Sequence, residues 1–320
     1  MLKAFKNALR RLTGNGQAAN EPCGTSIETV IAAVDALLER EQSSGERDRA
    51  FAALVARYAA HNPVESQTRA MFDAVLYAIV APKHRAVFWG DRMLTLDKAA
   101  GFLDDEAFRR SYEAVRGSHI YDAYESPHTI AWRLHTLVWA ARIALAVPGD
   151  FVECGVFKGD MSWVVANVLG SALDDRMFYL YDSFAGFSPK LSKPEDYPET
   201  PNFLEMANKT YRESDIYEHV LRRFADKPNV KVIRGFVPES FKLAMPDRIA
   251  YLHIDLNSPA AEIATLEVLF NRISSGGVIV FDDYGWKHYH RQREAEDRFM
   301  ADRGHTILEL PTGQGLLIKH

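Results

Sequence analysis

The sequence predicts an α/β protein with a doubly wound, mostly parallel sheet that ends in an antiparallel hairpin. From Pro148 onward, short apolar runs rich in β-branched and aromatic residues alternate with helical stretches. Strands that are apolar on both faces and alternate with helices are typical of a parallel sheet covered on both sides. Near the C-terminus, two apolar runs flank the Gly-containing connection 312–315. Such a short connection favours an antiparallel hairpin.

The individual elements follow from the periodicity of the apolar residues. We expect strands at residues 151–156, 178–184, 230–235, 249–256 and 277–283. We expect helices at residues 160–169, 214–224, 260–273 and 289–302. The parallel strands and the terminal hairpin together make a seven-stranded sheet, which distinguishes it from the six-stranded sheet of dinucleotide-binding domains.

The chain divides into three regions by composition. Residues 1–25 form a flexible tail that begins with a basic amphipathic stretch and ends in a small, polar linker. We expect the basic stretch to be a frayed end or a subunit contact in a homo-oligomer, and a membrane-surface anchor is the alternative. Residues 26–100 form a helical region, because apolar residues recur there at helical spacing. Residues 101–320 contain the sheet and the candidate site.

Charge and cysteine content exclude several classes of protein. The formal net charge of −5 argues against a nucleic-acid partner, because such a surface usually has a basic excess. The N-terminus lacks the apolar run of a secretory signal, and no apolar segment is long enough to cross a bilayer. Cys23 and Cys154 are the two cysteines, too few for a disulfide framework. We therefore expect a cytoplasmic protein with free thiols.

A glycine-containing turn follows the first parallel strand. Doubly wound sheets bind ligands beyond the carboxyl ends of their strands, and here the chain reads Glu153, Gly155, Gly159 and Ser162 at the spacing E-x-G-x-x-x-G-x-x-S. The glycines permit a tight turn and a close ligand approach, and the next helix offers free N–H groups to a carboxylate. The spacing is not that of a pyrophosphate cradle. The acid suits an amino-acid ligand such as the methionine half of S-adenosylmethionine, and an ordinary strand-to-helix turn is the alternative.

The next two strands also end in polar or small residues. Asp182 and Ser183 follow the second strand, where an acid can accept hydrogen bonds from the hydroxyls of a ribose. The alternative is a residue that caps a helix or a turn. Gly235 and Phe236 follow the third strand and offer a wall for an adenine, although Phe236 suits the core equally well.

Three carboxylates follow the fourth and fifth strands. Asp255 ends one strand, and Asp282 and Asp283 end the other. Adjacent strands lie about 4.8 Å apart, so the three side chains should meet above the sheet. Clustered carboxylates repel one another unless a cation or hydrogen bonds compensate them, and hard oxygen ligands suit Mg²⁺. The alternative is that these acids only cap strands or bind water. His253, two residues before Asp255, is either a core histidine or a proton acceptor.

These motifs together resemble the macrocin O-methyltransferase (TylF-like) family, which methylates hydroxyls on sugar-bearing natural products. The resemblance spans roughly residues 85–320 and rests on VPGDFVECGVFKGDMS, YLYDSFAGFSP, YLHIDLN and SSGGVIVFDDYGW. It implies a class I methyltransferase fold with helical additions. It also implies that Glu153, Gly155, Gly159 and Asp182 contact S-adenosylmethionine, and that Asp255, Asp282 and Asp283 hold Mg²⁺.

One position departs from the family pattern. Members usually carry a second acid two residues after the metal ligand of the fourth strand, and that acid is a candidate general base. This chain has Asn257 there. An amide oxygen can bind a metal or orient a substrate, but it does not accept a proton at neutral pH. The identity of the base therefore stays open, with His253 as one candidate.

The resulting functional hypothesis is a metal-dependent O-methyltransferase. It would move a methyl group from S-adenosylmethionine to a hydroxyl of a sugar or another polar small molecule, with Asp255, Asn257 and His253 nearest the chemistry. The polar, Pro-containing stretch 187–211 is a candidate lid, with a plain surface insertion as the alternative. Two other classes remain: a non-catalytic binding or scaffold protein, which Asn257 would suit, and a nicotinamide-dependent oxidoreductase.

Overall fold

The computed structural model describes residues 87–90, 93–116, 130–200, 202–212 and 215–320. The predicted tail 1–25 and the predicted helices before residue 87 lie outside these residues. The chain divides into two compact units, and among the described residues those up to Ala99 belong to the first and those from Ala100 onward to the second. The described part of the first unit contains two antiparallel strands, β1 (Val87–Gly90) and β2 (Met93–Leu96).

This hairpin corrects the prediction of a helical region that extends to residue 100. Its two strands read VFWG and MLTL, and apolar, aromatic and β-branched residues of this kind favour extended backbone. The strands are separated by only two residues, which is the length of a tight hairpin connection. The helical prediction was therefore wrong for this segment.

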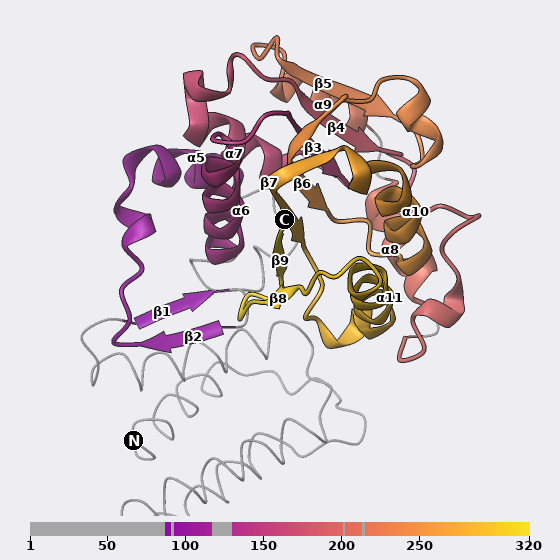
Figure 1. The fold of residues 1–320 in the computed structure, drawn as a ribbon. Coiled ribbons are helices and arrows are strands. Elements are labelled where there is room, and N and C mark those ends of the chain that lie inside the picture. Colours follow the sequence, from indigo (N-terminus) through magenta and orange to yellow (C-terminus); the bar gives the residue numbers. More distant parts are fainter. Residues whose placement is uncertain (1–86, 91–92, 117–129, 201, 213–214) are drawn as a thin grey trace, which may run out of the picture. The chain divides into compact units, whose positions relative to one another are not determined.

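The second unit is built on a seven-stranded sheet in the order β5-β4-β3-β6-β7-β9-β8 (Figure 1). The parallel strands are β3 (Asp150–Cys154), β4 (Phe178–Asp182), β5 (Val230–Arg234), β6 (Ile249–Ile254) and β7 (Ile273–Phe281). The last two strands are antiparallel: β9 (Gly315–Ile318) pairs with β7 and with β8 (Leu308–Glu309). The predicted doubly wound sheet with a C-terminal hairpin is confirmed.

Helices cover both faces of this sheet (Figure 1). One group contains α5 (Glu106–Arg116), α6 (Ala131–Ala144) and α7 (Asp160–Leu169), which pack together. The other group contains α10 (Pro259–Leu269) and α11 (His290–Ala301), which also pack together. Two further helices, α8 (Phe203–Tyr211) and α9 (Ile216–Arg223), follow β4. None of the described helices is long and apolar enough to span a membrane.

Short 3-10 segments link several of these elements. They lie at Gly101–Asp104, Gly170–Leu173, Pro194–Asp196, Glu239–Lys242, Phe270–Arg272 and Lys287–Tyr289. One of them ends the predicted helix 260–273 early, so that β7 begins at Ile273 rather than at residue 277. The polar and Gly-rich start of β7 lacks the apolar signal of a strand, yet Ile273 pairs with Ile249 of β6.

The central strand β6 brings a histidine into the interior of the sheet. All its residues are buried, because β3 and β7 flank it and helices cover both faces. A strand in this position is usually apolar throughout, and His253 is the exception. Its polar ring must therefore find partners inside the sheet.

Candidate active site

The carboxyl ends of β3, β6 and β7 bring the candidate residues to one edge of the sheet. Glu153 pairs in register with His253 across β3 and β6. One residue beyond the strands, the N–H of Asp255 donates to the Cys154 carbonyl (2.8 Å) and the N–H of Asp282 donates to the Ile254 carbonyl (3.0 Å). The ladder therefore fixes Glu153 and His253 inside the sheet and both aspartates at its rim.

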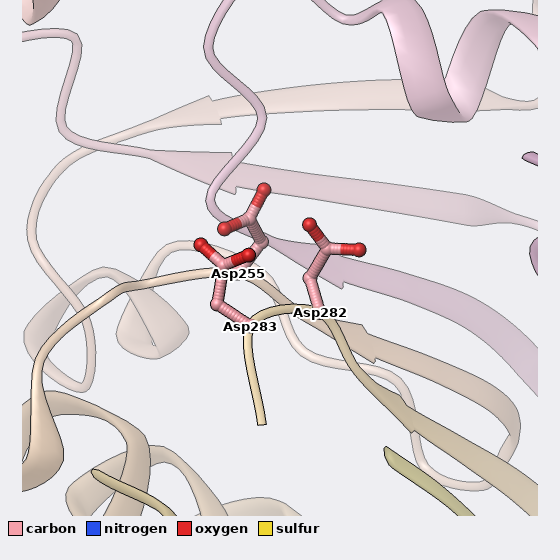
Figure 2. Close-up of side chains that lie close together, drawn as sticks. All are labelled: Asp255, Asp282 and Asp283. Atoms are coloured by element: carbon pink, nitrogen blue, oxygen red, sulfur yellow. The ribbon is translucent and has the colours of Figure 1, made fainter. Parts of the chain in front are cut away.

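Three carboxylates meet at this rim, as the sequence predicted. Ligand oxygens of Asp255, Asp282 and Asp283 lie within 4.8 Å of one another, and their side chains converge in Figure 2. Burial and the neighbouring charges of Asp282 and Asp283 raise the pKa of Asp255 well above its usual range. The cluster therefore carries strong mutual repulsion, which a cation would relieve.

Arg133 from α6 already supplies one positive charge to the cluster. Its guanidinium donates to Asp282 Oδ2 at 2.6 Å and to Asp283 Oδ1 at 3.0 Å. The other oxygen of Asp282 accepts a hydrogen bond from Gln314 Nε2 at 2.9 Å. Burial alone would raise the pKa of Asp282, but Arg133 and His253 outweigh burial and hold it below its usual range.

The donor set fits a hard divalent cation in its chemistry. Three carboxylates from two adjacent loops offer oxygen atoms at one point, which is the ligand type that Mg²⁺ prefers. Two of these carboxylates also pair with Arg133. A cation at this place would therefore have to share them with the guanidinium or displace it.

His253 joins the carboxylate cluster to Glu153. Its Nδ1 lies 3.0 Å from Glu153 Oε1, and its Nε2 lies 3.6 Å from Asp282 Oδ1. Burial would lower the pKa of His253, but interactions with Asp282 and Glu153 raise it to about 10. The imidazole is therefore a buried cation between two acids at neutral pH, and in that state it cannot accept a proton.

The turn between β3 and α7 is organised by Asp182. Asp182 Oδ2 accepts hydrogen bonds from the N–H groups of Val156 (2.7 Å) and Phe157 (2.8 Å), and Oδ1 accepts one from Phe184 (2.6 Å). A side chain at Gly155 (φ +91°) would collide with the backbone carbonyl of Asp255, because its Cβ would lie 1.8 Å from that oxygen. Glycine is thus required here by the approach of the loop after β6.

Two polar atoms near this turn lack partners among the described residues. Glu153 Oε2 and Ser162 Oγ are buried and accept or donate no hydrogen bond within this part of the chain. Buried polar groups are normally paired. Their position beside the β3–α7 turn is where the sequence predicts an amino-acid ligand.

The loop after β6 carries Asn257 in a left-handed conformation (φ +56°). Its Nδ2 donates to Asp255 Oδ1 at 3.0 Å, while its Oδ1 is buried without a hydrogen-bond partner among the described residues. Its backbone carbonyl accepts a hydrogen bond from the Tyr197 hydroxyl at 2.5 Å. A second contact joins Ser192 Oγ and Ser258 Oγ at 2.9 Å. The stretch 187–211 is therefore docked on the loop that holds Asn257.

Comparison with known proteins agrees with this arrangement. Residues 129–308 match the family described as macrocin-O-methyltransferase (TylF). The chain belongs to this family. The predicted O-methyltransferase class is thereby confirmed.

Two curated relatives and one solved structure illustrate what this chain is similar to. Mycinamicin III 3''-O-methyltransferase of Micromonospora griseorubida is 31% identical over 193 residues, 58% of this chain and 74% of that protein. The 8-demethyl-8-(2,3-dimethoxy-alpha-L-rhamnosyl)-tetracenomycin-C 4'-O-methyltransferase of Streptomyces olivaceus is 29% identical over 169 residues, 48% of this chain and 60% of that protein. The structure of the O-methyltransferase NovP matches with a TM-score of 0.53 and 21% identity over 66% of this chain and 97% of that chain. The last match shows the fold.

Some residues that were predicted to contact the cofactor have protein partners in this structure. The Ser183 hydroxyl donates to the Gly186 carbonyl (2.7 Å), so it stabilises a turn. Asp182 holds backbone amides, which is the alternative that the sequence left open. The Gly235 N–H donates to the Asp182 carbonyl (2.8 Å) and extends the sheet contact between β4 and β5. These contacts stabilise the backbone around the site.

Sequence analysis missed two residues that contact the carboxylates of this methyltransferase. Arg133 lies within the apolar helix α6, and Gln314 lies in the hairpin connection and is fully buried. A signal for Arg133 was present, because a charge among apolar helical residues must find a partner if it is buried. The sequence contains no such signal for Gln314, because polar residues are common in the connections between strands.

Proposed function

We propose that this protein transfers a methyl group from S-adenosylmethionine to a hydroxyl of a sugar or another polar small molecule, with a divalent cation at the carboxylate cluster. The single observation that carries the proposal is the juxtaposition at one sheet edge. There, His253 lies between Glu153, which comes just before the β3–α7 turn, and Asp282 of the carboxylate cluster. A methyl donor and a hydroxyl acceptor need such adjacent sites.

The methyl donor would lie against the β3–α7 turn. Glu153 Oε2 can accept a hydrogen bond from an ammonium group, and Ser162 Oγ can serve as a donor or an acceptor. Both atoms are buried without partners among the described residues, which supports a ligand at this place. The first N–H groups of α7 would face the carboxylate of the ligand. Asp182 would contribute by holding the turn in shape.

The acceptor would lie against the carboxylate cluster. Asp255, Asp282 and Asp283 would hold a divalent cation such as Mg²⁺, which lowers the pKa of a hydroxyl group when it is bound. Asn257 lies beside Asp255, and its amide oxygen has no hydrogen-bond partner in the described part of the chain; it would orient the acceptor hydroxyl. The protein's main contribution is then alignment of the reacting groups.

The stretch 187–211 would cover the acceptor. It contacts the Asn257 loop through Tyr197 and Ser192. The side chains of Tyr197 and Phe203 also pack on His288, which follows β7. A sugar acceptor is supported by the substrate of the tetracenomycin relative, whose name contains a rhamnosyl group.

Two measurements test this function. Calorimetric titration with S-adenosylhomocysteine should show binding, whereas titration with NAD should show none. A panel of glycosylated acceptors and free sugars should then be screened for methyl transfer from S-adenosylmethionine. Binding of NAD without binding of S-adenosylhomocysteine would refute the proposed methyl donor.

A further inference from the structure

Arg133 is a buried cation that the proposed reaction does not use. Its side chain is 8% exposed and bridges Asp282 and Asp283, whose side chains are 2% and 14% exposed. A guanidinium keeps its charge under all physiological conditions, and its planar fork suits two oxygen partners. The helix α6 thus places a permanent positive charge on the two carboxylates that follow β7.

The oxygens of the cluster are already well supplied with partners. Asp282 Oδ2 pairs with Arg133 and Asp282 Oδ1 with Gln314. Asp255 Oδ1 accepts a hydrogen bond from Asn257. A divalent cation that uses Asp282 or Asp283 must therefore compete for oxygens that the chain itself has engaged.

We propose that Arg133 is the resident counter-ion of the carboxylate cluster and that a divalent cation binds by displacing its guanidinium from Asp282 and Asp283. The inference rests on the cation site of the proposed function. Two arrangements would then alternate. In one, Arg133 neutralises the cluster, and in the other, the cation does so.

The surroundings of Arg133 offer a place for the displaced guanidinium. Its Cζ lies 5.1 Å from the ring centroid of Trp286, which is close enough for a cation–π contact. Trp286 follows Asp283 by three residues, and its backbone N–H donates to the Asp283 carbonyl (3.2 Å). Arg133 can therefore leave the carboxylates and still keep an attractive partner.

The test is the affinity for Mn²⁺, measured by calorimetry and by electron paramagnetic resonance on the full-length protein. Arg133→Gln removes the charge but keeps a hydrogen-bond donor, and it should bind Mn²⁺ about tenfold more tightly than the wild type, because repulsion between the cations is lost. Arg133→Lys keeps the charge and should bind like the wild type. Arg142→Gln is the matched control on the same helix, because Arg142 is exposed and pairs with Asp105 instead.

Thermal melting with and without Mn²⁺ guards against a folding defect. Because Arg133→Gln removes the counter-ion of the cluster, its melting temperature without Mn²⁺ should be lower than that of the wild type. Added Mn²⁺ should raise the melting temperature of Arg133→Gln by more than it raises that of the wild type. Failure of Mn²⁺ to restore an unfolded Arg133→Gln protein would overturn the inference.

Different results would refute the displacement of Arg133 and the cation site of the proposed function. If the wild type binds Mn²⁺ and folded Arg133→Gln binds it equally or more weakly, Arg133 does not compete and only the inference is lost. If neither protein binds Mn²⁺ and methyl transfer continues in excess chelator, the cation of the proposed function is lost together with the competition. Tighter binding in both Arg133→Gln and Arg133→Lys would also contradict a competition that depends on charge.

Discussion

His253 is a buried imidazolium that holds two acids in place. Its ring lies between Glu153 and Asp282, and its pKa near 10 leaves it protonated at neutral pH. Of the two roles that the sequence left open, the structure supports the interior one. The charge of His253 offsets the repulsion between a carboxylate at the donor site and one at the cluster.

The pH dependence of stability tests this assignment. The pKa of His253 in the folded protein exceeds its ordinary value of 6.5, so its stabilising contribution is complete below about pH 6.5 and declines as the pH rises toward 10. His253→Gln should lower the free energy of unfolding by about 1–3 kcal/mol at pH 6 and should flatten the decline between pH 6.5 and 10. Urea unfolding across this range measures both effects. An unchanged slope in the folded variant would show that His253 is neutral.

Asn257 occupies the position at which the resemblance to the family implies a second acid. Asn257→Asp replaces the amide that donates to Asp255 with a further carboxylate. Without a cation, the variant should lose about 1–3 kcal/mol of stability. With a cation and an accepted substrate, it should react faster at neutral pH, with general-base catalysis of about 10²–10⁴-fold as the upper bound. The rate should be measured against pH.

The opposite result for Asn257→Asp would also be informative. Loss of activity in a folded variant would mean that the amide orients the acceptor of this protein. The sugar acceptor inferred from the relatives should then be the first claim to be abandoned.

At the scale of elements, Asp182 connects two turns. It accepts hydrogen bonds from amides after β3 and after β4, so it fixes the turn against which the methyl donor would lie. Asp182→Ala should therefore lower stability by about 1–3 kcal/mol and weaken S-adenosylhomocysteine binding in parallel. The exposed Asp175→Ala on the preceding turn is a suitable control. Weaker binding without any change in melting temperature would instead indicate a direct contact with the ribose.

A pair of buried acids joins α10 to the loop of Asn257. Glu262 on α10 and Glu296 on α11 are both fully buried. Glu262 Oε1 accepts a hydrogen bond from the Leu256 N–H at 3.1 Å. Burial and the Glu262 charge raise the pKa of Glu296 well above its usual range. The carboxyl group of Glu296 therefore favours its protonated form more strongly than an exposed carboxyl group does, while Glu262 holds the loop through Leu256.

Glu296→Gln tests this pair. Because the pKa of Glu296 is raised in the folded state, the folded protein loses stability as the pH rises above the ordinary carboxyl value of 4.5. Glutamine has nearly the same shape and does not ionise, so it avoids this cost. The variant should be more stable than the wild type by about 1 kcal/mol or more at pH 8 and should lose that advantage at pH 4.5. Glu294→Gln, on the exposed face of α11, should change little. An equal advantage at both pH values would contradict a raised pKa of Glu296.

At the scale of the whole molecule, local patterns predicted what lies along the chain. Apolar runs bounded by glycine predicted the strands of the large sheet, and the strand ends predicted that Asp255, Asp282 and Asp283 would meet. Such local patterns do not predict contacts between elements that are far apart in the sequence. Arg133 lies 149 residues from Asp282, and only the packing of α6 on the sheet brings them together. The protein partners of Asp182 and Ser183 were equally hidden, because the same residue types suit a ligand and a turn.

In the proposed function, the methyl donor and the acceptor both bind at one edge of the large sheet. The β3–α7 turn would hold the methyl donor, and the loops after β6 and β7 would hold the acceptor. Neighbouring strands bring both within one site, and the stretch 187–211 would cover it. Methyl transfer at this edge of the sheet is therefore the activity to measure.

The most direct measurement follows an isotope-labelled methyl group from S-adenosylmethionine into an acceptor identified by the screen. We expect the wild type to place the label on an acceptor oxygen and Arg142→Gln to do so at the same rate. We expect no transfer with Asp255→Ala, although this variant should still bind S-adenosylhomocysteine. Excess chelator should also abolish transfer. Label on nitrogen or carbon, or undiminished transfer by folded Asp255→Ala, would contradict the proposed function.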